Sequence, residues 1–149
     1  MIEGKMKIRE WKYEDILKIS EMEKECFPKE PWSYKMLVSS FEEESFHGVL
    51  AEEDGEIVGY GGITQAVDSA DIDNLAVVEY YRNSGIGTAV LSELLKYAKA
   101  KGTKKVFLEV RVSNSVAMAL YLKCGFKGVY ARTRYYSDGE DCLVMVKEL

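Results

Sequence analysis

The feature that most constrains the fold of this chain is a glycine-rich loop between a strand and a long helix. The loop is Arg82-Asn83-Ser84-Gly85-Ile86-Gly87-Thr88, and the apolar run Leu75-Ala76-Val77-Val78 precedes it. Residues 86–101 then carry apolar side chains at helical spacing, and Gly102 predicts the end of that helix. A strand that leads through glycines into an amphipathic helix is typical of an α/β domain, and glycines let a ligand approach the backbone closely.

The rest of the sequence predicts further strands and helices for the same domain. We expect strands at residues 7–11, 46–52, 56–64, 71–78, 105–110, 126–134 and 142–148, and helices at 14–26, 34–43, 86–101 and 116–123. Ser33 is the expected N-cap of the second helix. The order β-α-α-β-β-β-α-β-α-β-β predicts an α/β fold with a mixed, mostly antiparallel central sheet flanked by helices. No linker or repeat divides the chain, so we expect residues 1–149 to form a single domain.

The composition excludes several classes of function. His47 is the only histidine, so a multi-histidine metal site is impossible, and no acidic cluster has the spacing of a calcium loop; we expect no metal. Three scattered cysteines favour a reducing, cytoplasmic location over a disulfide framework. The net charge of -5 argues against nucleic-acid binding and suits a cationic protein partner. No apolar run reaches about 20 residues and the N-terminus does not resemble a signal peptide, so we expect no membrane association.

The glycine loop is a candidate phosphate site. The first N–H groups of a helix lack internal acceptors and lie at the positive end of its dipole, which suits a pyrophosphate, and Arg82 adds guanidinium donors. The alternative is a plain glycine turn that starts a helix. A Walker loop is excluded because no Gly-Lys-Ser/Thr is present. A dinucleotide fold is disfavoured because Val90 replaces the third glycine or alanine of its fingerprint.

Three further polar residues stand out beyond the long helix. Glu109 interrupts the apolar strand at 105–110, so it must face solvent, a partner or a cleft. Asn114 precedes a short helix, where capping is the alternative to a binding role. Tyr121 lies in that helix and, in a chain with ten tyrosines, could equally be a core residue.

Together these pieces resemble the GNAT superfamily of acyl-CoA-dependent N-acetyltransferases over nearly the whole chain. Arg-x-x-Gly-x-Gly opens a helix, a strand follows, and then comes Asn114-x-x-Ala117-x-x-Leu120-Tyr121-x-x-x-Gly125-Phe126. Within the superfamily, the chain is most similar to RimI-type enzymes, which acetylate the N-terminal alanine of a small-subunit ribosomal protein. The segments that carry this second likeness are Phe27-Pro28 with Pro31-Trp32-Ser33, Leu75-Ala76-Val77, Leu108-Glu109-Val110-Arg111-x-Ser113-Asn114 and Tyr135-Tyr136-x-Asp138-Gly139-Glu140-Asp141.

The resemblance implies acetyl-CoA as cosubstrate and a role for each matching position. It implies Glu109 as general base, Tyr121 as general acid, and Trp32 and Tyr136 at the peptide entrance. Asn114 would bond the cosubstrate's arm, and two parallel strands would splay apart beside the thioester. The backbone groups expected to pair with the pantetheine belong to Leu75, Ala76 and Val77, and those expected at the pyrophosphate to Asn83, Ser84, Gly85, Ile86, Gly87 and Thr88. The chain departs from the pattern where Lys29 and Glu30 expand the usual Phe-Pro-Trp-Ser, and where Asn83 and Thr88 are neutral.

The expected acceptor is the N-terminal α-amine of a basic protein, with alanine first and a ribosomal protein as partner. An α-amine has a pKa of roughly 8 against about 10.4 for lysine, so it is the easier amine to deprotonate. Other amines remain open: a lysine, another protein N-terminus or a small metabolite. A non-catalytic acyl-CoA-binding module is the alternative of a different class, and we expect a monomer or weak dimer.

Overall fold

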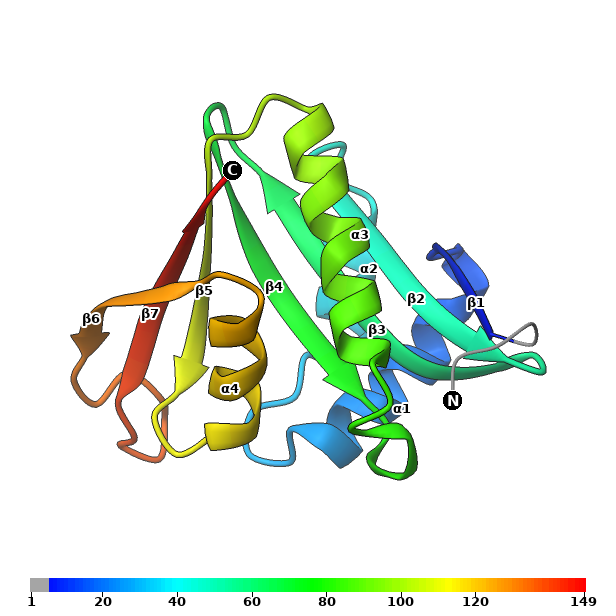
Figure 1. The fold of residues 1–149 in the computed structure, drawn as a ribbon. Coiled ribbons are helices and arrows are strands. Elements are labelled where there is room, and N and C mark those ends of the chain that lie inside the picture. Colours follow the sequence, from blue (N-terminus) through cyan, green and yellow to red (C-terminus); the bar gives the residue numbers. More distant parts are fainter. Residues whose placement is uncertain (1–5) are drawn as a thin grey trace.

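A seven-stranded sheet in the order β1-β2-β3-β4-β5-β7-β6 runs through the molecule (Figure 1). The structure is a computed structural model that describes residues 6–149, so the expectation of no signal peptide at the N-terminus falls partly outside it. The strands are β1 (Met6–Glu10), β2 (Phe46–Glu53), β3 (Glu56–Gln65), β4 (Ser69–Val77), β5 (Lys105–Arg111), β6 (Lys127–Arg132) and β7 (Cys142–Glu148). The helices are α1 (Ile16–Cys26), α2 (Tyr34–Phe41), α3 (Ile86–Ala100) and α4 (Ser115–Lys123), with short 3-10 turns η1 (Tyr13–Asp15) and η2 (Glu79–Tyr81). Only β4 and β5 pair in parallel among the described strands, which confirms the mixed, mostly antiparallel α/β fold.

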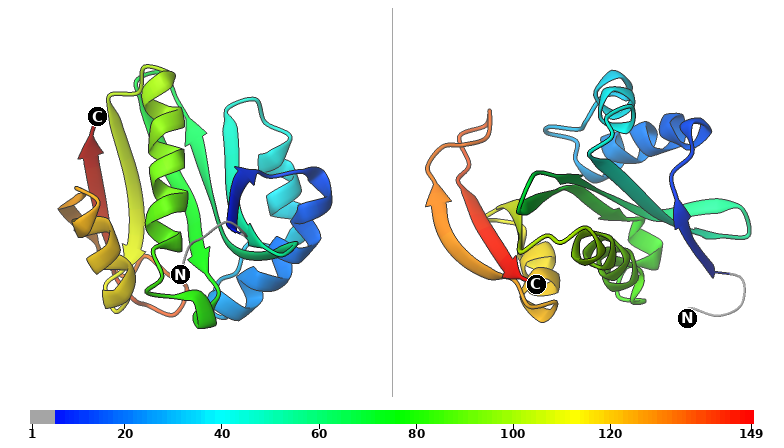
Figure 2. Two further views of the ribbon diagram at one scale, coloured as in Figure 1. Left: turned by 45° about the vertical axis from the view of Figure 1, so that its right-hand side comes forward. Right: turned by 90° about the horizontal axis from the view of Figure 1, so that it is seen from above.

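The helices cover the sheet from both sides. Figure 2 shows α1 and α2 on one face and α3 and α4 on the other. The apolar stripe expected on the long helix is the buried face of α3: Ile86, Val90, Leu91, Leu94 and Ala98. A second apolar cluster fills the space under α1 and α2, with Trp11, Ile16, Ile19, Leu50 and Tyr60 among its members. Burial of these two faces against the sheet is the main source of stability.

The predicted element order is confirmed, and the boundaries differ by a few residues. Ser33 caps α2, since its Oγ accepts a hydrogen bond from the N–H of Met36 at 3.2 Å. Gly102 follows the last turn of α3 with φ of 84°, as expected of a C-terminal glycine. The first helix begins later than predicted because Asp15 accepts a bond from the N–H of Lys12 and tightens residues 13–15 into η1. The turn η2 was not predicted, and β6 is shorter than the expected strand at 126–134.

The strands β4 and β5 separate along their length. They pair only from Ser69–Asp71 to Lys105–Phe107, whereas β5 pairs with β7 over all its residues. A bulge in β4 lies at this point: Ile72 pairs with Ile63 and Asn74 with Gly62, which leaves Asp73 without a partner on β3. Bulges bend and twist a strand, so β4 turns away from β5, as Figure 1 shows. The expected splay is therefore present, and it opens one edge of β4.

Candidate active site

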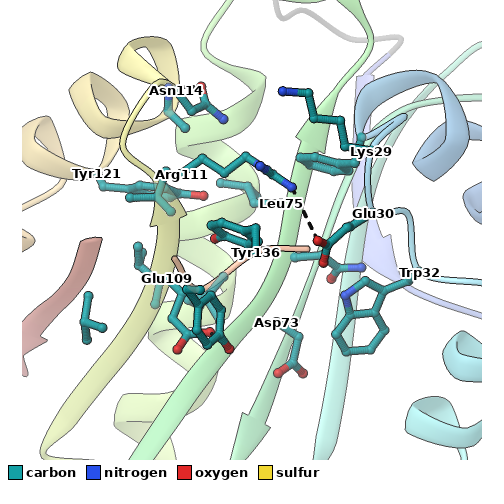
Figure 3. A pocket seen from close by; sticks show the side chains of 18 of the residues that line it. Lys29, Glu30, Trp32, Asp73, Leu75, Glu109, Arg111, Asn114, Tyr121 and Tyr136 are labelled. Carbon is teal, nitrogen blue, oxygen red and sulfur yellow. Dashed lines mark hydrogen bonds and ion pairs between the residues drawn. The ribbon is translucent and has the colours of Figure 1, made fainter. Parts of the chain in front are cut away.

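A cavity of about 1050 Å³ lies where β4 and β5 separate. The two strands form its floor, and its walls come from the segment between α1 and α2, the segment between β6 and β7, and the start of α4 (Figure 3). It brings together six residues that the sequence singled out: Trp32, Leu75, Glu109, Asn114, Tyr121 and Tyr136. Residues separated by up to about a hundred positions in the sequence thus share one concave site, the usual place for a substrate.

Glu109 faces this cavity, and both of its carboxylate oxygens are engaged. It lies on β5, whose alternation buries Leu108 and Val110 on the opposite face. The hydroxyl of Tyr135 donates to Glu109 Oε1 at 2.9 Å, and Arg132 Nε lies 3.1 Å from Oε2. With its side chain 38% exposed, the carboxylate is held in place yet open to the cavity. The polar residue in the apolar strand therefore faces a cleft, one of the possibilities expected for it.

Tyr121 reaches the same cavity from α4. Its ring packs edge-on against Phe126, with centroids 5.9 Å apart, and only 7% of the residue is exposed. Burial raises the pKa of Tyr121 to about 12, so its hydroxyl stays protonated near neutral pH. Figure 3 shows the hydroxyl directed into the cavity, where it is available as a proton donor. The ring packs in the core while the hydroxyl reaches the site, so the two interpretations of this residue are compatible.

Asn114 caps α4. Its Oδ1 accepts a hydrogen bond from the N–H of Ala117 at 3.1 Å, which is the capping role that the sequence left open. The same residue lines the cavity. Capping fixes the side chain at the cavity wall and uses one lone pair of its oxygen, so the amide N–H donors and the second lone pair are left for a bound molecule.

The cavity wall that carries Trp32 is held in place by hydrogen bonds to the buried carboxyl of Glu23. Glu23 of α1, 1% exposed, accepts a bond from the backbone N–H of Trp32 at 2.8 Å and from the hydroxyl of Tyr60 at 2.6 Å. Burial raises the pKa of Glu23, and these two donors oppose the effect. The segment between α1 and α2 therefore has a fixed anchor under the cavity.

Lys29 and Glu30, the two residues that expand the Phe-Pro-Trp-Ser segment, contact the segment between β6 and β7. Glu30 Oε1 accepts from the N–H of Ser137 at 2.6 Å and from its Oγ at 2.5 Å, and Lys29 Nζ lies 3.2 Å from Asp138. We call Lys29, Glu30, Ser137 and Asp138 the entrance clasp. Arg111 supports it, since its guanidinium pairs with Asp138 at 3.0 Å and stacks on Tyr136 with 4.0 Å to the ring centroid. The clasp therefore joins the segment between α1 and α2 to the segment between β6 and β7.

The glycine loop lies beyond the end of β4 and is not part of the cavity lining. Gly85 has φ of 89°, a left-handed conformation that favours glycine, and a side chain on Gly87 would come within 3.2 Å of Leu120. The first bond of α3 runs from the N–H of Ala89 to Gly85, so the preceding N–H groups have no helical acceptor. Arg82 donates through Nε to the carbonyl of Val77 at 3.0 Å, and Ser84 Oγ donates to that of Tyr81.

Between the loop and the cavity runs the open edge of β4. Leu75, Ala76 and Val77 pair with Gly61, Tyr60 and Gly59 of β3 on one side, while the side toward β5 has no strand pairing. An extended chain with amide groups can add to such an edge as another strand would. Most of the residues that the sequence predicts to bind the cosubstrate therefore lie either on this edge of β4, at residues 75–77, or at the start of α3, at residues 83–88.

Several further residues that no sequence motif marked also line the cavity. Asp71 and Asp73 of β4 lie on the cavity floor, and Glu23 and Arg132 contribute the contacts described above. An acid within an apolar run was the signal used for Glu109, whereas Asp71 and Asp73 alternate with apolar residues, as on any strand with one polar face. Over residues 6–149, no three His, Cys, Asp or Glu side chains are placed to hold a metal ion. In the same range, no helix has the length and apolar character needed to cross a membrane.

Comparison with known proteins agrees with this architecture. The Acetyltransferase (GNAT) family matches residues 15–126. A Bacillus subtilis (strain 168) protein, provisionally named a ribosomal protein bS18-alanine N-acetyltransferase, is 35% identical over 143 residues, which are 95% of this chain and 94% of that protein. An N-alpha-acetyltransferase of Sulfurisphaera tokodaii is 36% identical over 156 residues, which cover 96% of this chain and 93% of that protein. The crystal structure of the ribosomal-protein-S18-alanine N-acetyltransferase from Escherichia coli superposes with a TM-score of 0.87 at 29% identity. The superposition covers 96% of this chain and 93% of the Escherichia coli protein.

Proposed function

Because this chain belongs to the GNAT family and is an acetyl-CoA-dependent N-acetyltransferase, we propose that its acceptor is the free α-amine of a protein N-terminus. The observation that carries the proposal is the pair of loops at the cavity: Trp32 comes from one and Tyr136 from the other, we take the space between them as the mouth, and Glu109 lines the same cavity. A chain end can enter such a mouth, and the names of the similar proteins point to the same acceptor class. We further propose alanine as first residue and a basic ribosomal protein as partner, since the net charge of -5 attracts cations.

The acetyl donor would lie along the open edge of β4. The backbone of Leu75, Ala76 and Val77 would pair with its amide groups, and the N–H groups at the start of α3, from Ile86 to Thr88, would hold its pyrophosphate. A positive helix end without a competing acceptor suits an anion, and the glycines leave the backbone accessible. Asn114 would contact the same arm from α4.

Glu109 is proposed as the general base and Tyr121 as the general acid. The acceptor's ammonium must lose a proton before its nitrogen can attack, and a carboxylate serves this step directly or through a water. The departing sulfur needs a proton, which the protonated, cavity-facing hydroxyl of Tyr121 would donate. Because Tyr135 and Arg132 engage both oxygens of Glu109, these two contacts hold that carboxylate in place within the cavity.

Two hexapeptides test the acceptor class. One begins with a free alanine and lacks lysine, while its partner has a blocked N-terminus and one free lysine. We expect the wild-type enzyme to acetylate the first and not the second, at a rate that falls with added salt because the attraction is electrostatic. Preferential modification of the blocked, lysine-bearing peptide would refute the α-amine proposal while leaving the acetyltransferase activity in place.

A further inference from the structure

A second cavity, of about 560 Å³, lies on the face of the sheet that α3 and α4 cover (Figure 2). It shares no lining residue with the active-site cavity. Its lining comes from the outer side of α3, the end of α4 and the end of β7, and includes four lysines: Lys96 and Lys99 of α3, Lys123 of α4 and Lys147 of β7. We call this cavity the lysine groove.

Positive charge gathers in the lysine groove, although the whole chain carries a net charge of -5. The four lysines share the lining with a single acidic residue. Within residues 6–149, Lys96 is ion-paired with Glu93 at 3.0 Å, whereas Lys99, Lys123 and Lys147 take part in no ion pair. Three ammonium groups at one place are therefore left without a carboxylate of this chain.

The lysine groove also has an apolar part. Leu95, Cys124 and Leu149 line it, stay half-buried, and pack against the main core. Lys147 lies over the backbone beside them: a side chain on Gly125, whose φ is 97°, would come within 2.4 Å of Lys147 Nζ. The absence of a side chain at Gly125 thus gives this ammonium its room. The groove combines cations with a recessed apolar surface.

This combination distinguishes between three kinds of anionic partner. A nucleic-acid duplex carries one charge per about 1.7 Å of its axis, so most of its phosphates would lie beyond the lysines and face a chain of net negative charge. A bilayer surface is flat, and the apolar atoms of a recessed groove do not reach into it. A short protein segment brings a few carboxylates and an apolar side chain to one place, which suits the groove in both charge and shape.

We propose that the lysine groove docks an extended acidic segment of a partner protein, in which carboxylates flank one or two apolar side chains. The carboxylates pair with the lysines, and the apolar side chains contact Leu95, Cys124 and Leu149. Pairs of exposed charges are individually weak and are screened by salt, so the complex is reversible and salt-sensitive. The proposal does not depend on the acceptor, because the two cavities have separate linings.

Fluorescence anisotropy with the labelled peptide Glu-Glu-Leu-Phe-Glu-Glu, its N-terminus blocked by the label, tests the docking. We expect the wild-type protein to bind this peptide, with an affinity that falls several-fold between about 50 mM and about 300 mM salt. A variant with both Lys99→Glu and Lys123→Glu should bind at least about tenfold more weakly, because two attractions become repulsions. The pair Lys99→Gln and Lys123→Gln should lie between, and a peptide with Gln in place of Glu should not bind.

Lys18→Glu with Lys24→Glu is the matched control on α1, which covers the opposite face of the sheet. Both lysines are exposed and take part in no ion pair within residues 6–149, so the net charge changes equally and no ion pair is lost. We expect this control to keep its peptide affinity within about twofold of wild type, because distant charges are screened. Both double variants should retain the wild-type kcat on the alanine peptide and the wild-type KM for acetyl-CoA.

Four results would overturn the proposal. The first is a wild-type protein that does not bind the acidic peptide, or that loses affinity equally in the groove and control variants. The second is a rise in the KM for acetyl-CoA confined to the groove variant, which would assign these lysines to the cosubstrate. The third is a wild-type protein that self-associates in sedimentation velocity while the groove variant is monomeric, which would make a second copy the occupant. The fourth is preferential binding of a DNA duplex or of phosphatidylserine vesicles that requires Lys99 and Lys123.

Discussion

Glu23→Ala is expected to loosen the segment between α1 and α2 that carries Trp32, and to destabilise the protein. Glu23 is 1% exposed and accepts two hydrogen bonds, one from the hydroxyl of Tyr60 and one from the backbone N–H of Trp32. Alanine removes both acceptors. The hydroxyl of the fully buried Tyr60 then loses this acceptor, whereas the N–H of the half-buried Trp32 can reach water.

The size of the effect follows from these contacts. A buried donor left without an acceptor costs about 1–3 kcal/mol, and the lost side-chain volume adds a cavity term of about 1 kcal/mol. Removal of a buried carboxyl recovers part of this cost, because burial already disfavours its charged form. We therefore expect the free energy of unfolding at neutral pH to fall by about 2–3 kcal/mol.

Glu23→Gln is the matched control, and its effect depends on pH. The pKa of Glu23 is raised in the folded state, so the folded protein binds the proton more tightly than the unfolded chain does. Wild-type stability from this group is thus fully present below the unfolded pKa of about 4.3 and is lost as pH rises through the folded pKa. Glutamine keeps an acceptor and does not ionise. The free energy of unfolding of Glu23→Gln, relative to wild type, should therefore rise as the pH increases from about 4.3 through the folded pKa of Glu23.

Urea unfolding at acidic and neutral pH, together with peptide kinetics, measures both consequences. We expect Glu23→Ala to raise the KM for the alanine peptide several-fold, because the Trp32 segment loses its anchor, and to leave the KM for acetyl-CoA unchanged. An unfolding free energy within about 0.5 kcal/mol of wild type, with an unchanged peptide KM, would refute the reasoning that this carboxyl holds the wall in place.

Three further substitutions test other parts of the site. Gly85→Val places a β-branched residue at a φ of 89°, so it should abolish the thermal shift produced by CoA, and an unchanged shift would move the pyrophosphate away from the start of α3. Tyr121→Phe should lower kcat about 10–100-fold with little change in Tm, since only the hydroxyl is removed; a variant that unfolds would identify Tyr121 as a packing residue. Trp32→Ala should raise the KM for peptide and spare that for acetyl-CoA, and an equal rise in both would contradict its place at the entrance.

Most of the fold could be predicted from the sequence because its signals are local. The apolar stripe of α3, the cap at Ser33 and the glycine at 102 depend on neighbouring residues alone. The bulge at Asp73 depends on which residues of β3 pair with β4, and no local pattern specifies that pairing. The order of the helices and strands could be predicted from the sequence, whereas the residue at which β4 bends could not.

The site was predictable to the extent that a residue conflicts with its own strand. Glu109 was found because it interrupts an apolar run, whereas Asp71 and Asp73 alternate with apolar residues and carry no such signal. The entrance clasp could not, because Glu30 and Ser137 are 107 positions apart and meet only after the two loops are placed. The capping of α4 by Asn114 was expected as an alternative and is present, and it does not decide that residue's part in binding.

The most direct test of the α-amine proposal uses one peptide that carries both candidate amines, a free N-terminal alanine and an internal lysine. The wild-type enzyme is given this peptide and acetyl-CoA at neutral pH, and fragment-ion mass spectrometry locates the acetyl group. We predict a single acetyl group on the alanine nitrogen, because the mouth between Trp32 and Tyr136 admits a chain end and Glu109 lies behind it. An acetyl group on the lysine side chain, with the alanine nitrogen left free, would contradict the account.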